Sequence, residues 1–424
     1  MTKDKVTERS VVIVGSGIIG LSVLYRLIEE IESKPLSNIH YSINVVTTID
    51  KELLCHYNTA DVIFDQEIAS VYAGAHQRPF PTEYINGDKK ITYQRRESLY
   101  TKETFEYILD KLQHNKDWKN FTYDTTIQLC RGYDLIKKAS EAYQNFNDGY
   151  NESNLKNFIK DDNSLDESIV PKLIQNSLDM ICSYDTYVVN TPRFLRFLYN
   201  YCCSRSKTIS NIDLAFHFNQ EIKYLENAVD FSLNVKPLIV NCTGKGTIQW
   251  NKEATLCSTY LPIRGQTLLI SVPDNVVYRK FAKNTVTFQD GGKWSFVINR
   301  PLPKAHKNFG KKLYFIIGGT KQSNSLDKNI SNEDLNYVLN NAKMIYPKLF
   351  KDGEWQLERV NVGFRPGSKI GSVVNLEHKA RIDKKTYYPV INCYGFAGYG
   401  VECSFGAANH VLALINRAFR EANL

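Results

Sequence analysis

This sequence of 424 residues lacks the features that mark a disulfide-rich, metal-binding or membrane-spanning protein. Its nine cysteines are an odd number with no repeated spacing and no Cys-x-x-Cys pair, so we expect free thiols in a reducing compartment. The eight histidines are scattered, and we expect no metal site. No apolar run approaches the roughly 20 residues of a membrane-spanning helix. We therefore expect no association with a membrane.

The sequence also lacks a dense run of positive charge. It carries 53 basic and 45 acidic residues, a net charge of +8 that is spread along the chain. Such a charge is a weak indication of small acidic substrates, whereas nucleic-acid binding needs a denser patch. The nearest to a patch is the basic stretch 304–312, which we interpret as a solvated hairpin loop. We expect no nucleic acid as partner.

Signals that direct a protein to a cellular compartment usually lie at the two ends of its sequence. The polar N-terminal sequence MTKDKVTERS leads straight into an apolar strand, and we expect no signal peptide. The last three residues, Ala422-Asn423-Leu424, resemble a relaxed form of the peroxisomal serine-lysine-leucine address. Two interpretations stay open. The tripeptide binds a peroxisomal import receptor, or it is a plain helix end in a cytoplasmic protein.

What the sequence does contain is a glycine fingerprint directly after an apolar strand. Residues 11–20 read VVIVGSGIIG, which predicts a strand, a tight turn and a helix over 18–31. Gly15 allows the tight turn, Gly17 lets the backbone approach a pyrophosphate, and Gly20 lets the helix pack close to the strand. The motif predicts a dinucleotide site, although a lone glycine fingerprint is a weak signal.

The two halves of this predicted nucleotide site differ in how well the sequence fits them. The phosphates would lie at the helix N-terminus beside Ile18 and Ile19, where free N–H groups and the helix dipole favour anions. The acid that normally binds the ribose is missing from the end of the second strand. Asp50 follows nearby, and Thr47 or Thr48 are the alternatives that could replace the acid.

Hydrophobic periodicity predicts further elements along the whole chain. We expect helices at 94–114, 171–180, 192–204, 331–344 and 403–420, and strands at 42–46, 184–189, 209–217, 230–235, 238–244, 262–270, 294–300, 313–319 and 387–393. The stretch 143–168 is rich in Asn, Asp, Lys and Ser and is expected to be a long polar loop.

Several motifs occur in a fixed order between the two chain ends. They are DQEIASVYAGAHQRPF (65–80), SYDTYVVNTPRFLRFL (183–198), VNCTGKG (240–246), LPIRGQTLLI (261–270), IIGGT (316–320), VNVGFRPGSK (360–369) and YGFAGYGVECSFGAA (394–408). With these motifs the chain resembles the D-amino-acid oxidase and D-aspartate oxidase family along most of its length.

The resemblance implies an α/β fold with two interleaved domains. A doubly wound, Rossmann-like FAD-binding domain would be built from residues 1–80, 180–255 and 366–424. An α+β substrate domain with a mainly antiparallel sheet would be built from 81–179 and 256–365.

The resemblance also implies the reaction. A non-covalently bound FAD would take a hydride from the α-carbon of a D-amino acid, while the protein orients the substrate. Oxygen would reoxidise the flavin to give hydrogen peroxide, and the imino acid would hydrolyse to a 2-oxo acid and ammonia. Peroxide production agrees with a peroxisomal location.

Site residues follow from the matched motifs. Arg365 corresponds to the family's arginine for the substrate carboxylate, which a guanidinium binds bidentately. Gly398 would lie near the substrate as well as the flavin. The resemblance places further FAD contacts at Asp65, Gln66, Ala73, Gly74, Thr243, Gly244, Tyr399, Gly400, Val401 and Glu402.

Two positions depart from the family pattern or distinguish its branches. Phe296 stands where the family has an active-site tyrosine, and a lost hydrogen bond to a charged group is worth roughly 1.5–3 kcal/mol. Lys321 stands where D-aspartate oxidases have an arginine, and a second cation would favour D-aspartate, D-glutamate or N-methyl-D-aspartate. The alternative is that Lys321 extends into solvent.

Three functions therefore stay open. The first is an oxidase of acidic D-amino acids. The second is an oxidase of neutral D-amino acids or of secondary amines, similar to glycine and sarcosine oxidases. The third is a flavin-fold protein without turnover, which Phe296 and the missing ribose acid favour.

Overall fold

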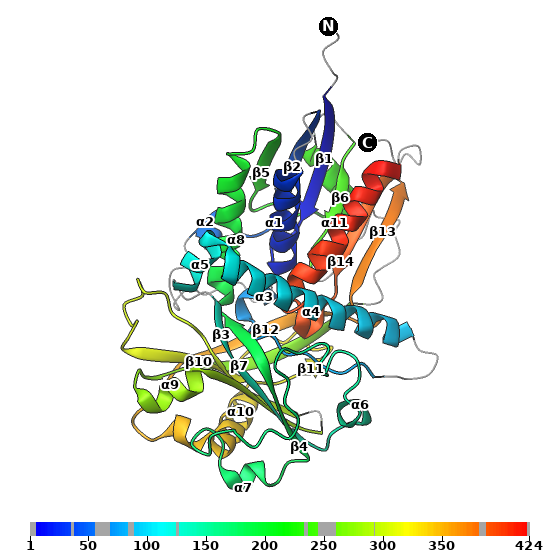
Figure 1. The fold of residues 1–424 in the computed structure, drawn as a ribbon. Coiled ribbons are helices and arrows are strands. Elements are labelled where there is room, and N and C mark those ends of the chain that lie inside the picture. Colours follow the sequence, from blue (N-terminus) through cyan, green and yellow to red (C-terminus); the bar gives the residue numbers. More distant parts are fainter. Residues whose placement is uncertain are drawn as a thin grey trace. The chain divides into compact units, whose positions relative to one another are not determined.

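The computed structural model divides into two compact units, each assembled from separate chain segments (Figure 1). The parallel-sheet unit comprises Met1–Tyr57, Leu195–Pro262 and Pro366–Leu424, and the mixed-sheet unit comprises Asn58–Phe194 and Ile263–Arg365. Within these bounds the structure describes residues 6–34, 38–55, 68–83, 89–123, 127–232, 236–244, 260–291, 293–380 and 387–421.

The sheet of the parallel-sheet unit has the strand order β13-β14-β6-β1-β2-β5. Its strands are β1 (Thr7–Val14), β2 (Ile39–Val46), β5 (Ile212–His217), β6 (Leu238–Asn241), β13 (Val373–Ala380) and β14 (Tyr387–Tyr394). All neighbouring pairs are parallel except β13 with β14. The carboxyl ends of β1, β2, β6 and β14 therefore reach the same edge of the sheet.

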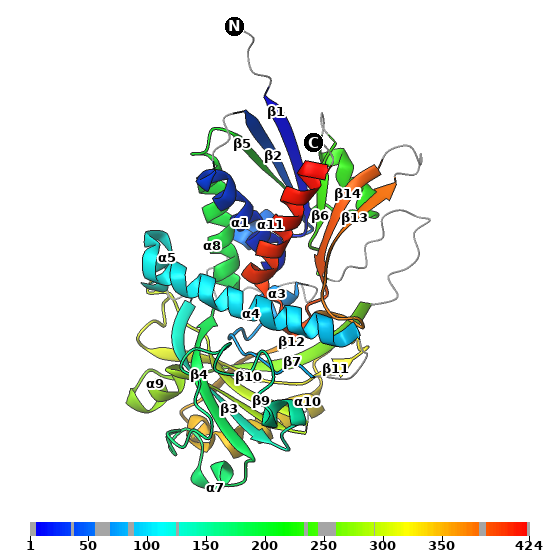
Figure 2. The ribbon, with the colours of Figure 1, turned by 45° about the vertical axis from the view of Figure 1, so that its right-hand side comes forward.

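Helices cover one face of this sheet. They are α1 (Ile18–Ser33), α8 (Thr191–Ser206) and α11 (Ser404–Glu421), and α1 and α11 lie side by side in both views (Figures 1 and 2). Arg26 Nε donates to Asn409 Oδ1 over 2.9 Å, which joins these two helices. Tyr25 stacks on Tyr201 of α8 with ring centroids 4.4 Å apart. The helices thus form one layer joined by polar and aromatic contacts.

The opposite face of the sheet is also buried. The 3-10 helix η1 (Leu225–Phe231) places Leu225 and Val229 in one apolar cluster with Val12 and Ile239. A strand that is buried on both faces needs apolar side chains at every position. This explains why residues 11–14 of β1 and 238–240 of β6 are unbroken apolar runs instead of alternating ones.

The mixed-sheet unit contains one sheet of order β11-β7-β10-β9-β8-β3-β4, with β12 also paired to β7. The strands are β3 (Ile127–Lys137), β4 (Met180–Val189), β7 (Tyr260–Pro273), β8 (Asn284–Asp290), β9 (Lys293–Asn299), β10 (Lys312–Gly318), β11 (Gln322–Ser323) and β12 (Gln356–Ser368). β3 and β8 are parallel. The pairs β7–β10, β10–β9, β9–β8, β3–β4 and β11–β7 are antiparallel.

Helices pack against this sheet and complete its core. The remaining helical segments of the chain are α2 (Lys51–Cys55), α3 (Ala69–Tyr72), α4 (Lys89–His114), α5 (Lys116–Tyr123), α6 (Glu141–Gln144), α7 (Lys172–Gln175), α9 (Val276–Ala282), α10 (Asn332–Ile345), η2 (Pro347–Phe350) and η3 (Ala397–Tyr399). Val338 and Ile345 of α10 join Phe315 and Ile317 of β10 in one cluster. Ser331 caps α10 by accepting a hydrogen bond from the Asp334 N–H.

A buried ion pair fixes the segment that follows α3. Arg78 Nε donates to Asp134 Oδ1 over 2.9 Å, and both side chains are buried. Tyr150 donates to the other oxygen of Asp134, and the Arg78 guanidinium lies 4.1 Å from the ring centroid of Trp294. The Gln77 N–H donates to the Tyr187 carbonyl of β4. These contacts hold residues 69–80 against the mixed sheet.

The unit bounds differ from the expected division in this region. The expected boundaries grouped residues up to 80, and those from 180 onward, with the nucleotide-binding part. In the structure the described residues 68–80 and 180–194 belong to the mixed-sheet unit. Because β4 pairs with β3 over its whole length, it continues the mixed sheet.

Two expected elements were wrong. The first two residues of the expected strand at 230–235 belong to η1, whose first turn is closed by hydrogen bonds between Tyr224 and Asn227, and residues 233–235 lie outside the described part of the chain. The expected helix at 171–180 is reduced to α7, because Met180 already pairs with Ile136 in the sheet. β3, β8, β12 and β13 were not expected. Among the described residues no helix is long and apolar enough to cross a membrane.

Candidate active site

The glycine turn between β1 and α1 is built by very close backbone approaches. Gly15 has a φ of +104°, and a Cβ there would lie 2.5 Å from the Cys242 carbonyl oxygen. A Cβ on Gly20 would lie 1.9 Å from the Gly15 carbonyl oxygen. Both positions therefore require glycine. The tight turn and close helix packing expected from the fingerprint are present.

The first turn of α1 is suited to an anion. Gly17 is the N-cap residue; no side chain caps the helix, and the first turn holds no acidic residue. Ile18 and Ile19 are buried. Backbone N–H groups at such a helix start attract a phosphate. This arrangement fits the pyrophosphate of a dinucleotide.

Two other glycine turns meet α1 at the same edge of the sheet. The Gly395 N–H, after β14, donates to the Gly244 carbonyl, after β6, over 3.2 Å. A Cβ on Gly400 would lie 3.9 Å from Cγ2 of Ile18, so the C-terminal loop adjoins the start of α1. The structure thus brings most of the expected cofactor residues of this unit to one edge. In the C-terminal loop Gly398 is exposed, Tyr399 is partly buried, and Val401 and Glu402 are buried.

A ladder of asparagines supports this edge. Thr243 Oγ1 donates to Asn241 Oδ1 over 2.9 Å, Asn241 Nδ2 donates to Asn392 Oδ1, and Asn392 Nδ2 donates to Asn375 Oδ1. The ladder crosses β6, β14 and β13 at directly paired positions. Sequence reasoning did not find it. The available signal was the dipeptide Asn-Cys, which occurs at 241–242 and again at 392–393.

The residues considered for the ribose are engaged within the protein. The buried Thr47 accepts hydrogen bonds from Ser16 Oγ and from the Ile49 N–H. Asp50 accepts from the Glu52 N–H at the start of α2. Thr48 is exposed. Asp65 and Gln66 lie outside the described residues, as does the C-terminal tripeptide 422–424.

In the mixed-sheet unit Arg365 lies flat against the backbone of β7. A Cβ on Gly265 would lie 2.3 Å from Arg365 Nη1, so only glycine leaves room for the guanidinium. Arg365 Nη1 also donates to the Thr320 carbonyl over 3.2 Å. The side chain is partly exposed. Such a fixed, accessible guanidinium is suited to bind a carboxylate.

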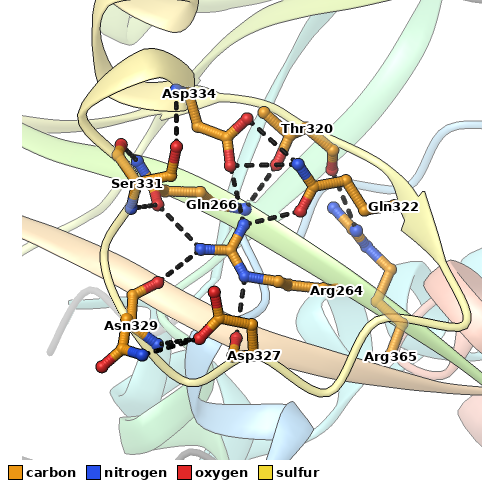
Figure 3. Close-up of polar contacts among 9 residues, drawn as sticks. All are labelled: Arg264, Gln266, Thr320, Gln322, Asp327, Asn329, Ser331, Asp334 and Arg365. Carbon is orange, nitrogen blue, oxygen red and sulfur yellow. Dashed lines mark hydrogen bonds and ion pairs between the residues drawn. The ribbon is translucent and has the colours of Figure 1, made fainter.

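A second arginine lies buried behind this one (Figure 3). Arg264 is 2% exposed and donates to the side chains of Gln266, Gln322 and Asp334 and to the carbonyls of Asp327 and Asn329. Sequence reasoning quoted this arginine only within a motif. The signal was a charged residue in the apolar strand PIRGQTLLI, which requires a buried partner.

Phe296 and Gly74, both expected site residues, lie together. A Cβ on Gly74 would lie 3.6 Å from Cε2 of Phe296, and one on Gly318 would lie 2.2 Å from its Cζ. The ring therefore lies against the backbone that leads to Gly319 and Thr320. The neighbouring Ala73 carbonyl accepts a hydrogen bond from Thr191 Oγ1 over 3.3 Å.

Lys321 is exposed and directly precedes β11. It forms no ion pair with any residue that the structure describes. Gln322, the next residue, is opposite Arg264 in the pairing of β11 with β7. Lys321 therefore lies beside Gly265 in this register.

His76 is a neutral group within the segment that contains Gly74. Its Nδ1 lies 2.9 Å from Thr285 Oγ1. Burial, followed by the charge of Arg78, lowers the pKa of His76 from 6.5 to about 3. The imidazole is therefore uncharged at neutral pH and adds no charge beside Arg78.

The fold and the nucleotide edge agree with the comparison to known families. The FAD-dependent oxidoreductase (DAO) family model matches residues 10–414, and the chain belongs to this family. It is an FAD-dependent oxidoreductase, so the expected cofactor and fold class are confirmed.

Individual relatives cover almost the whole chain. A D-aspartate oxidase of Talaromyces thermophilus is 26% identical over 96% of this chain and 94% of its own length. A D-amino-acid oxidase of Fusarium vanettenii is 21% identical over 98% of this chain and 99% of its own length. The solved glycine oxidase of Bacillus cereus ATCC 14579 superposes with a TM-score of 0.60 at 14% identity, covering 96% of each chain. The last likeness shows the fold alone.

We predict that Gly265→Ala displaces Arg365 without unfolding the protein. The new methyl group would overlap the guanidinium, which is the end of a flexible side chain and moves more easily than backbone. We expect the dissociation constant of a carboxylate ligand to rise at least about tenfold, which corresponds to 1.4 kcal/mol. FAD affinity should be unchanged. Titration of the wild type and of Gly265→Ala with FAD and with a carboxylate measures both affinities, and unchanged carboxylate affinity would contradict the prediction.

We predict that His76 makes the protein less stable as the pH falls from 6.5 toward 3. In this window the unfolded chain binds a proton at His76 and the folded protein does not. One such proton gives a slope of about 1.4 kcal/mol per pH unit near pH 5. Urea unfolding at several pH values should show a shallower slope for His76→Gln, by about one proton. An identical slope in both proteins would show that His76 titrates normally in the fold.

Proposed function

We propose that this protein oxidises an acidic D-amino acid, giving a 2-oxo acid, ammonia and hydrogen peroxide. The observation that carries the proposal is Arg365, which is held against Gly265 and bonded to the Thr320 carbonyl while it remains partly exposed. A family member that acts on an amino acid needs such a cation for the α-carboxylate.

We assign the residues to cofactor binding and to substrate binding as follows. The backbone around Gly15–Gly20 and Gly244 would hold a non-covalent FAD, with Tyr399 and Gly400 as further contacts. When bound, FAD would accept the two electrons of the substrate Cα–H bond and transfer them to oxygen. Arg365 fixes the substrate carboxylate and thereby the direction of this bond. The ring of Phe296, which lies beside Gly74 and Gly318, would exclude water from the substrate.

Preference for an acidic side chain is supported by Lys321. Successive side chains of an extended strand point to opposite sides, and Gln322 points to Arg264. Lys321 then extends on the side of Gly265, where Arg365 lies. Two cations on one side of the strand suit a dicarboxylate. D-aspartate oxidases of Talaromyces thermophilus and Cryptococcus neoformans are among the full-length relatives.

The second candidate is an oxidase of neutral D-amino acids or secondary amines. Phe296 favours it, because the pocket wall that this ring forms is apolar. The D-amino-acid oxidase of Fusarium vanettenii is also a full-length relative. A protein without turnover is the third candidate, since the family's tyrosine hydroxyl is absent at Phe296. Substrate range distinguishes the first two, and flavin reduction distinguishes both from the third.

We predict that D-aspartate bleaches the oxidised flavin band of the purified protein under anaerobic conditions. In Arg365→Leu the concentration needed for half-maximal bleaching should rise at least about a hundredfold, because a hydrogen-bonded charge pair is lost. Absorbance titration measures this directly.

Three results would change the assignment. Bleaching by D-alanine or sarcosine, and not by D-aspartate, would transfer the assignment to the second candidate. A yellow protein that no amino acid bleaches would support the protein without turnover. Equal half-maximal concentrations for the wild type and Arg365→Leu would remove Arg365 from carboxylate binding.

We predict that Lys321→Met lowers kcat/KM for D-aspartate by about tenfold to a hundredfold, the loss expected for one charge-assisted hydrogen bond. Turnover of D-alanine should be unchanged or faster. Lys321→Arg should keep the preference for D-aspartate. Lys348→Met, which removes another exposed lysine of the same unit, is the matched control. A preference that is equal in all four proteins would mean that Lys321 extends into solvent.

A further inference from the structure

We propose that Arg264 and Asp334 are positioning residues for Arg365, and that they set the affinity of the protein for a substrate carboxylate without touching it. The inference rests on the proposed role of Arg365. It concerns the buried polar network behind β7, which is defined here as Arg264, Gln266, Gln322, Ser331 and Asp334 (Figure 3).

All five N–H groups of Arg264 are used. Nε donates to the Asp327 carbonyl over 2.8 Å, and the two Nη atoms make four further hydrogen bonds of 2.6–3.1 Å. A guanidinium has five donors in a rigid planar arrangement. Because all of them are engaged, Arg264 has no donor left for a ligand, and its role is to fix the chain segment that surrounds it.

Asp334 supplies the negative charge of the network. Its Oδ2 lies 2.7 Å from Arg264 Nη1, and its side chain is only 13% exposed. Gln322 joins both residues, since its Oε1 accepts from Arg264 and its Nε2 donates to Asp334. A buried guanidinium that loses its carboxylate keeps an uncompensated charge. The segment from 322 to 334 is therefore held by charge as well as by hydrogen bonds.

The network is connected to Arg365 through Thr320. The Gln266 N–H donates to Thr320 Oγ1 over 2.9 Å, and the Thr320 N–H donates to the Gln266 carbonyl over 3.2 Å. Gln266 also accepts a hydrogen bond from the Ser331 N–H. Thr320 is thus fixed by β7, and Gln322, two residues further along the chain, is fixed by Arg264 and Asp334. Its carbonyl is the group that binds Arg365 Nη1.

Arg264 and Arg365 lie on opposite sides of β7, and the segment 320–322 links their positions. Arg264 and Gln266 point to one side of β7, and the intervening Gly265 leaves its other side open to Arg365. Movement of the 320–322 segment would therefore move the Thr320 carbonyl against Arg365. A displacement of this kind changes the orientation of a guanidinium that must bind a carboxylate bidentately.

The test compares binding of propanoate and propanamide to the FAD-loaded protein, followed by the change in flavin absorbance and by calorimetry. Asp334→Asn removes the charge of the network and keeps its shape. We expect the dissociation constant of propanoate to rise at least tenfold. The constants of propanamide and of FAD should change less than twofold, because neither depends on the orientation of Arg365.

A rescue variant separates positioning from general loss of structure. In the double variant D334N/Q322E the carboxylate returns to Arg264 from the neighbouring residue, and propanoate affinity should recover to within threefold of the wild type. Asp185→Asn is the matched control, because it breaks the Arg131–Asp185 ion pair elsewhere in the same sheet. This control variant should leave the dissociation constants of propanoate and propanamide unchanged.

Each other outcome overturns the inference. Unchanged propanoate affinity in Asp334→Asn would show that the network does not position Arg365. Equal weakening of propanoate and propanamide, or no recovery in the double variant, would show a merely structural role. If Asp334→Asn fails to fold, Gln322→Leu takes its place with the same expected result. A wild type that binds propanoate no better than Arg365→Leu does would instead refute the proposed function.

Discussion

The structure depends on backbone approaches that are too close for a side chain. At Gly15 and Gly20 the main chain of β1, α1 and the β6 turn comes together at the edge that we propose for the dinucleotide. At Gly265 the strand comes equally close to the guanidinium of Arg365. A missing Cβ lets backbone approach backbone at Gly15 and Gly20, and lets backbone approach a charged side chain at Gly265. The rest of each unit keeps these backbones in place.

The distribution of charge follows from burial. Arg264 is buried, so it must be neutralised by Asp334 and saturated with hydrogen bonds. Arg365 is partly exposed and can exchange water for a ligand carboxylate. Arg78 is paired with Asp134, and His76 beside it is neutral. The two buried arginines of these networks, Arg264 and Arg78, are therefore already paired with carboxylates. Arg365, which is partly exposed, is the arginine that can bind a ligand.

In the function proposed above, specificity would depend on a few side chains of the mixed-sheet unit. Phe296 has an aromatic ring without a hydroxyl, so more of the proposed carboxylate binding would fall to Arg365. Lys321 follows Thr320, which is tied to the same arginine. In the proposed function, residues 320–322 would thus connect recognition of the α-carboxylate with recognition of the substrate side chain.

The sequence by itself determined the local features: the glycine turn after β1, the long helices α1, α10 and α11, and the family to which the motifs belong. These follow from steric limits and periodicity within short segments. Only the tertiary structure decided how distant polar residues pair. The asparagine ladder and the five hydrogen bonds of Arg264 join strands and loops that are far apart in the chain. The bounds of β3 and β8 are likewise set by the strands with which they pair. Local sequence can mark a polar residue as buried, but it does not show which side chain is its partner across a sheet, because that pairing depends on register.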